Sequence, residues 1–144
     1  MTMPGNGTEL IGDREAVFHR AFDVTSEPLE ALDQLVELGF KRILTSGQEP
    51  SVPQGAELIK ELIGYAGDRI EILPGGGIRP HNIQAIVEQT GAKQVHLSAF
   101  EQRLDPSVHN RPHITFDGAL RPPEDRYDIV DHNVIRYISE LLSP

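Results

Sequence analysis

Short apolar runs alternate with helical patterns from residue 15 to residue 99. The apolar runs predict strands over 15–23, 41–45, 69–73 and 94–99. Between them, apolar residues recur at helical spacing over 28–38, 53–66 and 80–90, and Gly39 and Gly91 are placed to cap two of these helices. The strands begin about 25 residues apart, which is the pace of β/α units. Right-handed crossovers would make the strands parallel and adjacent, so the pattern predicts an α/β protein built from parallel (β/α) repeats.

The rest of the chain has weaker patterning. Residues 1–14 are rich in Gly, Asn and Thr and are expected to be a frayed N-terminal segment. Residues 15–144 are expected to form one domain, which includes a long irregular segment over 101–123. A last helix is predicted over 124–142, because one side of it would be apolar; that side consists of Ile129, Val130, Val134, Ile138 and Leu141.

Composition narrows the classes of partner. The chain has 144 residues and a formal net charge of −9, which opposes binding to nucleic-acid backbones and anionic membranes. It contains no cysteine, so it offers neither disulfides nor a thiolate metal site. No apolar run is long enough to span a bilayer, and the N-terminus lacks the pattern of a secretion signal. We therefore expect a cytoplasmic protein.

Four motifs stand at the strand ends in register with the predicted elements. They are FHRAFD at 18–23, RILTSGQ at 42–48, PGGGIRP at 74–80 followed by Asn82, and VHLSA at 95–99. In this order and at these spacings they closely resemble the CutC family of copper-homeostasis proteins. The resemblance covers roughly residues 13–100, with a weaker echo in the last helix.

The resemblance implies a TIM barrel, a fold that typically takes about 250 residues. By resemblance the four predicted strands correspond to strands five to eight of that barrel, and residues 1–14 to the end of the preceding helix. The chain would then be a partial barrel, either a truncated product or fragment that lacks the N-terminal half, or one half of a homodimer that closes a barrel. An open parallel sheet with unpaired edges is an aggregation risk, so a monomer is expected to be poorly stable.

Ligands bind at the carboxyl ends of parallel strands, where these motifs lie. The glycine run at 75–77 could hold an anion or phosphate, or could serve only as a tight turn. The TSG segment at 45–47 offers hydroxyls and amides to a ligand, or caps the next helix. Arg79 could clamp an anion or be solvated. The candidate anion-binding residues are Arg20, Thr45, Ser46, Gly47, Gly75, Gly76, Gly77, Arg79 and Ser98.

Strand alternation gives an expectation for side-chain direction. His96 and Ser98 share one face and should point into the barrel mouth. In the first strand only one of the neighbours His19 and Arg20 can do so. Phe18 and Phe22 favour the helix-covered side for Arg20, which places His19 and Asp23 at the mouth, and the opposite assignment remains open.

Two further side chains have structural interpretations. Glu71 should point inward and form a salt bridge with an Arg or Lys inside the barrel, in preference to acting as a catalytic carboxylate. Asn82 is expected to cap or contact the glycine loop.

Three readings of function compete. The resemblance implies copper homeostasis with copper as the bound metal. The residues themselves offer copper only His19 and His96, with Asp23 as a further candidate, since there is no cysteine and Met1 and Met3 lie in the N-terminal segment. The second reading is an enzyme that acts on a small phosphorylated or carboxylated molecule at the strand ends, with no reaction assignable. The third is an inactive fragment of a longer barrel.

Overall fold

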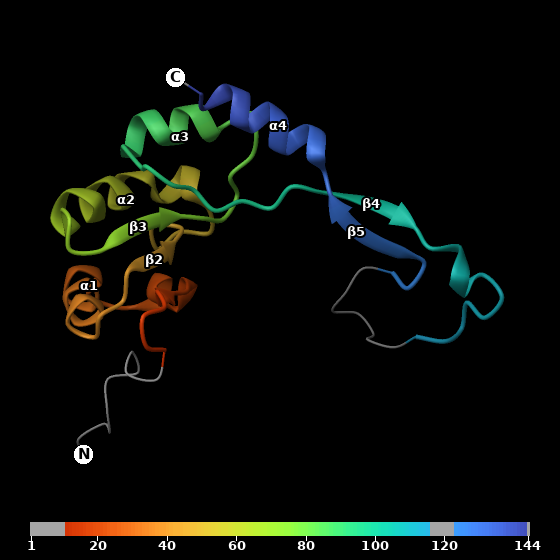
Figure 1. The fold of residues 1–144 in the computed structure, drawn as a ribbon, viewed down its shortest axis with the longest axis horizontal. Helices are drawn as coiled ribbons and strands as arrows, with labels where there is room; N and C mark the ends of the chain where they lie inside the picture. Colours follow the sequence, from red (N-terminus) through yellow and green to blue (C-terminus); the bar gives the residue numbers. More distant parts are fainter. Residues whose placement is uncertain (1–10, 116–122, 144) are drawn as a thin grey trace, which may run out of the picture. The chain divides into compact units, whose positions relative to one another are not determined.

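The structure, a computed structural model, describes residues 11–115 and 123–143. The chain divides between Leu97 and Ser98 into two compact units, which we treat separately (Figure 1). Most of the predicted N-terminal segment 1–14 lies outside the described residues. Within the described part of the chain, no helix is long and apolar enough to cross a membrane.

The first unit is an α/β fold with a parallel three-stranded sheet in the order β1-β2-β3, which confirms the predicted class. Figure 1 shows α2 and α3 side by side above β3. The elements of this unit are β1 (Val17–Phe18), the 3-10 helix η1 (Arg20–Val24), α1 (Pro28–Glu37), β2 (Arg42–Thr45), α2 (Val52–Ala66), β3 (Glu71–Pro74) and α3 (Ile83–Thr90).

The core lies between the helices and one face of this sheet. Alternate strand residues are buried, and Ile43 of β2 and Ile72 of β3 are paired in register. The helices contribute apolar side chains at helical spacing, as the sequence predicts. The fully buried ones are Leu32 of α1, Val52, Ile59 and Leu62 of α2, and Ile83 of α3.

The first predicted strand is mostly wrong. Only Val17 and Phe18 of 15–23 form a strand, and the chain then turns into η1. The His19 Nδ1 atom accepts a hydrogen bond from the Ala21 amide at 3.0 Å, and the Phe22 amide donates to the His19 carbonyl. The turn that these bonds close buries Phe22 completely, so burial is achieved without extended backbone.

The fourth predicted strand is wrong in extent. Of residues 94–99, only His96 forms a bridge, which is parallel and opposite Gly75; the His96 amide donates to the Pro74 carbonyl at 2.8 Å. Pro74 has no N–H to extend this ladder, and the Gly75 amide already donates to the Thr45 carbonyl. The edge of β3 is therefore paired at one point.

The second unit contains an antiparallel pair that the sequence did not suggest. Its elements are β4 (Phe100–Leu104), the 3-10 helix η2 (Pro106–Val108), β5 (Arg126–Val130) and α4 (His132–Leu141). The segment predicted as irregular, 101–123, thus includes β4, and residues 116–122 of it lie outside the described residues. The helix predicted over 124–142 is wrong in its first part, which is β5. The Asp131 carboxylate caps α4 by accepting from the Asn133 and Val134 amides.

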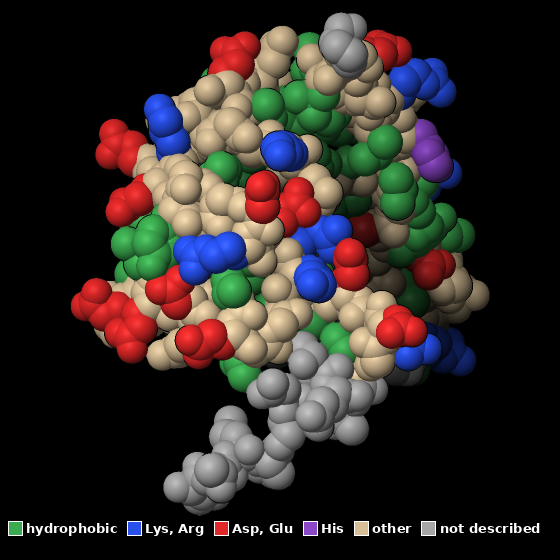
Figure 2. Space-filling view, turned by 60° about the vertical axis from the view of Figure 1, so that its left-hand side comes forward, with side chains coloured by type: hydrophobic (Ala, Val, Ile, Leu, Met, Phe, Trp, Pro, Cys, Tyr) green, Lys and Arg blue, Asp and Glu red, His purple; other side chains and the backbone are tan. Residues whose placement is uncertain are grey.

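Charge is spread over the surface. On the face seen in Figure 2, acidic and basic side chains are interspersed and basic side chains form no continuous patch.

Candidate functional site

Asp23 is the hub of a hydrogen-bonded cluster at the carboxyl ends of β1 and β2. Its carboxylate accepts hydrogen bonds from the hydroxyl of Thr45, from the amide of Ser46 at 3.1 Å and from the amide of Gln48 at 3.3 Å. Thr45 and Ser46 are completely buried. The TSG segment is therefore held in place by one carboxylate from η1.

Arg20, not His19, reaches this cluster from η1. Its Nε donates to Asp23 at 2.7 Å and its Nη2 donates to the Ser46 hydroxyl at 2.6 Å. The favoured interpretation is wrong in placing Arg20 under the helices, because the chain turns into η1 after His19, and the alternative left open for Arg20 holds. Asp23 lies at the strand ends as expected. The Arg20 side chain remains 43% exposed. It lies beside the glycine loop, where a Cβ on Gly76 would come 3.2 Å from Nη1.

The cluster keeps Asp23 ionised. Burial alone would raise the pKa of the Asp23 carboxyl, but hydrogen bonds from Thr45, Arg20 and Ser46 outweigh it and hold that pKa below its ordinary value of 3.8. The guanidinium of Arg20 and the carboxylate of Asp23 therefore form an ion pair at the strand ends at neutral pH.

Gln48 is a member of this cluster that the sequence did not single out. It is the one residue other than glycine with a positive φ among the described residues, at 59°. Its side-chain amide donates to the Thr25 carbonyl at 2.7 Å and to the Thr25 hydroxyl at 3.0 Å. These bonds fix the loop after β2 to the end of η1. The sequence signal for Gln48 was its place as the last residue of the RILTSGQ motif.

The glycine loop has a packing reason at each position. A Cβ on Gly75 would lie 2.5 Å from the Leu44 side chain, and one on Gly77 would lie 2.8 Å from Ser51. Gly76 and Gly77 have φ of 116° and 76°, and the Gly76 carbonyl accepts from the Val52 amide at the start of α2. The tight-turn interpretation thus accounts for the glycines, and anion binding by this loop stays a prediction.

A similar close approach holds Gly47. A Cβ on Gly47 would lie 2.2 Å from the Gly55 carbonyl oxygen, and one on Gly55 would lie 2.0 Å from the Ser46 carbonyl oxygen. The loop after β2 and the first turn of α2 are therefore in backbone contact, which only a pair of glycines permits.

The remaining anion candidates are not part of this cluster. Arg79 is exposed and donates from Nη1 to the Ile78 carbonyl. Asn82 contacts the glycine loop as expected, because its Oδ1 accepts from the Arg79 amide and its Nδ2 donates to the Gly77 carbonyl. Ser98 belongs to the second unit.

The three weak metal candidates do not form a metal site. Within the described residues, no group of three His, Cys, Asp or Glu could hold an ion. The His19 Nδ1 atom is used by the Ala21 amide, and the Asp23 oxygens are used by the cluster. The donor set found here therefore does not fit a resident copper ion, which prefers several sulfur or imidazole ligands.

A separate polar group lies at the other end of the strands. Arg42 forms ion pairs with Glu15 and with Glu71, the latter at 3.1 Å, which confirms the salt bridge expected for Glu71.

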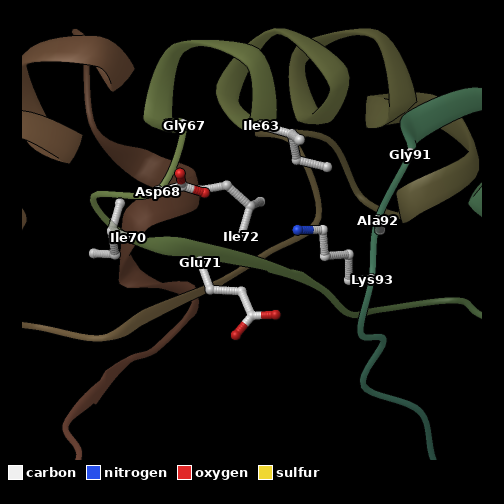
Figure 3. A pocket seen from close by; sticks show the side chains of 9 residues that line it. All are labelled: Ile63, Gly67, Asp68, Ile70, Glu71, Ile72, Gly91, Ala92 and Lys93. Atoms are coloured by element: carbon white, nitrogen blue, oxygen red, sulfur yellow. The ribbon is translucent and has the colours of Figure 1, made fainter.

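A cavity of about 290 Å³ lies where α2 and α3 end. Figure 3 shows the Lys93 side chain extending toward Ile72, while Glu71 points away. The cavity is lined by Ile63, Gly67, Asp68, Ile70, Glu71, Ile72, Gly91, Ala92 and Lys93.

Comparison with known sequences decides the family. The sequence model of the CutC family matches residues 10–101. The chain belongs to the CutC family. A family protein CutC from Treponema denticola is 51% identical over 121 residues, which is 84% of this chain and 49% of that protein. A human copper homeostasis protein cutC homolog is 38% identical over 124 residues, which is 86% of this chain and 45% of that protein.

A solved structure agrees with this assignment. The protein assigned as copper homeostasis protein CutC from Streptococcus agalactiae is 44% identical, with a TM-score of 0.56 over 59% of this chain and 42% of that chain. The present chain spans about half the length of the CutC relatives that it matches.

Proposed function

We propose that this chain acts in copper homeostasis in the cytoplasm. The observation that carries the proposal is the family match over 10–101, together with relatives whose names state copper homeostasis. We also infer that β1, β2, β3 and the segment around His96 correspond to strands five to eight of the family's TIM barrel. The order of the four motifs and the partial coverage of the S. agalactiae chain support that numbering.

Copper is the cargo in this proposal. The described residues present no closed ligand set for it, so contact with copper would rely on the exposed imidazoles of His19 and His96. Imidazole is a ligand that suits copper, so these two side chains are the candidates for contact with the metal.

Growth under copper stress tests this role. We expect the chain to restore growth of a bacterium that lacks its own CutC protein on medium with raised copper. His19→Ala and His96→Ala should weaken the rescue, whereas His81→Ala, which changes an exposed histidine on another loop, should not. Failure of the unaltered chain to restore growth would contradict the proposal and favour an inactive fragment.

An anion-binding enzyme is the second candidate, and the orientation of Arg20 favours it. The guanidinium is fixed by Asp23 and Ser46 but is still 43% exposed beside Gly76. A half-exposed, prepositioned guanidinium can bind a phosphate or carboxylate. The residues of this cluster do not assign a reaction to this candidate.

Calorimetric titration with inorganic phosphate tests this second candidate. We expect Arg20→Ala and Gly76→Val each to weaken phosphate binding at least tenfold, about 1.4 kcal/mol. Arg69→Ala is the control. Arg69 pairs with Asp33 at 2.7 Å and does not belong to the Asp23 cluster, so this change should leave phosphate binding unchanged. Unaltered affinity in the Arg20 and Gly76 variants would rule out the anion site.

A further inference from the structure

The guanidinium of Arg20 has one edge occupied and one end free. Its Nε donates to Asp23 Oδ2 at 2.7 Å and its Nη2 donates to the Ser46 hydroxyl at 2.6 Å, and these two acceptors lie 2.9 Å apart. They therefore take the side edge of the planar group. The other N–H groups, both on Nη1 and the second on Nη2, donate to no residue that the structure describes. Nη1 and Nη2 thus present two parallel N–H groups at the outer end.

Both acceptors that hold this edge are themselves held by backbone. Ser46 is completely buried, and its hydroxyl lies 2.5 Å from the Glu49 carbonyl oxygen. The Asp23 carboxylate accepts from the Ser46 amide at 3.1 Å. The guanidinium is therefore oriented in the free protein, so that a ligand at its outer end would not have to order a flexible side chain.

Glycine backbone borders the free end. A Cβ on Gly76 would lie 3.2 Å from Arg20 Nη1 and 3.5 Å from the Ser46 Cβ, so any side chain there would crowd the guanidinium. The Gly76 carbonyl accepts from the Val52 amide at 2.9 Å. The amides of Gly76 and Gly77 donate no hydrogen bond to the part of the chain that the structure describes. The same loop thus offers further donors beside Nη1.

Net charge alone does not explain attraction of an anion to this place. Arg20 and Asp23 are both ionised, so the pair is neutral, and the whole chain has a formal net charge of −9. Binding would have to come from directional hydrogen bonds. Two parallel N–H groups match two oxygens of one carboxylate or phosphate, whereas a single-atom anion such as chloride cannot satisfy both.

We propose that Asp23 and Ser46 position Arg20 so that its outer end binds two oxygens of one carboxylate or terminal phosphate group beside Gly76. The substrate or ligand of this site is then a small molecule that carries such a group, and anions are selected by geometry. Ser46 is a positioning residue, because it acts through Arg20. The inference rests on the anion-binding candidate of the proposed function.

Calorimetric titration in a chloride-free buffer tests which anion this end of Arg20 takes. Inorganic phosphate and acetate are titrated separately, and we expect saturable binding of at least one of them. Binding of phosphate alone indicates a phosphorylated ligand, and binding of acetate indicates a carboxylated one. Sodium chloride should give no saturable binding, and chloride affinity equal to that of the oxyanion would overturn the inference.

A double-mutant cycle tests the positioning role. Arg20→Lys keeps the positive charge but removes the parallel N–H groups, and should weaken oxyanion binding about fivefold. Ser46→Ala should weaken binding about threefold in the unaltered chain and have no further effect beside Arg20→Lys. An equal loss from Ser46→Ala in both backgrounds, or full affinity in Arg20→Lys, would overturn the inference.

Two further variants complete this design. Arg69→Lys is the matched control, because Arg69 also pairs with an aspartate, Asp33 at 2.7 Å, and it should leave binding unchanged. Arg20→Lys leaves the buried Ser46 in place, so it tests the parallel N–H groups even where Ser46→Ala fails to fold by circular dichroism.

Failure of this inference is distinguishable from failure of the proposed function. Absence of phosphate and acetate binding by the unaltered chain contradicts both the inference and the anion-binding candidate. Binding that is lost in Gly76→Val but retained in Arg20→Lys contradicts only the inference. The copper role is measured separately, by growth under copper stress.

Discussion

At the scale of single residues, Asp23 organises the strand ends. It receives hydrogen bonds from a guanidinium, two hydroxyls and two backbone amides, and its side chain is 9% exposed. Hydrogen bonds to a charged group each contribute about 1.5–3 kcal/mol, and their loss leaves buried donors without an acceptor. The positions of Arg20, Thr45 and Ser46 therefore depend on one carboxylate.

Asp23→Asn should destabilise the fold by about 2 kcal/mol at pH 7, because an amide cannot accept all of these donors. The Asp23 pKa is lowered in the folded chain, so its stabilising effect is complete above its ordinary value of 3.8 and is lost as the pH falls through the folded value. The deficit of the variant should therefore shrink below pH 3.8.

Urea unfolding followed by circular dichroism, at pH 7 and in acid, measures this difference. Asp33→Asn is the matched control, since Asp33 also pairs with an arginine but is 41% exposed, and it should cost less. Equal stability of Asp23→Asn and the unaltered chain at pH 7 would show that the cluster does not support the fold.

At the scale of elements, the sequence predicts the helices and strands that contain periodic apolar residues and misses the turns between them. The helices α1, α2 and α3 and strands β2 and β3 follow from periodic apolar residues, and Gly91 ends α3 in the left-handed conformation as expected. Strand alternation failed after Phe18, because the bond from the Ala21 amide to His19 closes a turn that no period reveals. The prediction of a helix over β5 is wrong because Ile129 and Val130 fit an apolar helical side as well as a strand.

The candidate site shows the same limit. Strand-end motifs correctly indicate that Asp23, Thr45 and Ser46 lie together, since parallel strands end at one edge. The choice between His19 and Arg20 depends on a rotation of one peptide after a strand, which the sequence leaves open. Gln48 is missed because its contribution comes from a φ of 59°, a property of the folded backbone.

At the scale of the whole molecule, the two units differ in how they are stabilised. The first unit buries a core of aliphatic side chains between helices and sheet. In the second, every residue of β4 is exposed, including Phe100 at 54% and Leu104 at 64%, and Val130 of β5 is 56% exposed. A two-stranded ribbon without a covered face is marginally stable in water. Stability should therefore be concentrated in the first unit.

Amide hydrogen exchange on the full chain measures, residue by residue, how stability is distributed between the two units. Amides of β2 and α2 should open only with global unfolding, whereas those that pair β4 with β5 should exchange about a thousandfold faster, since global stability is at least about 5 kcal/mol for a typical domain. Protection of β4 equal to that of β2 would contradict this expectation and would mean that another surface covers the ribbon.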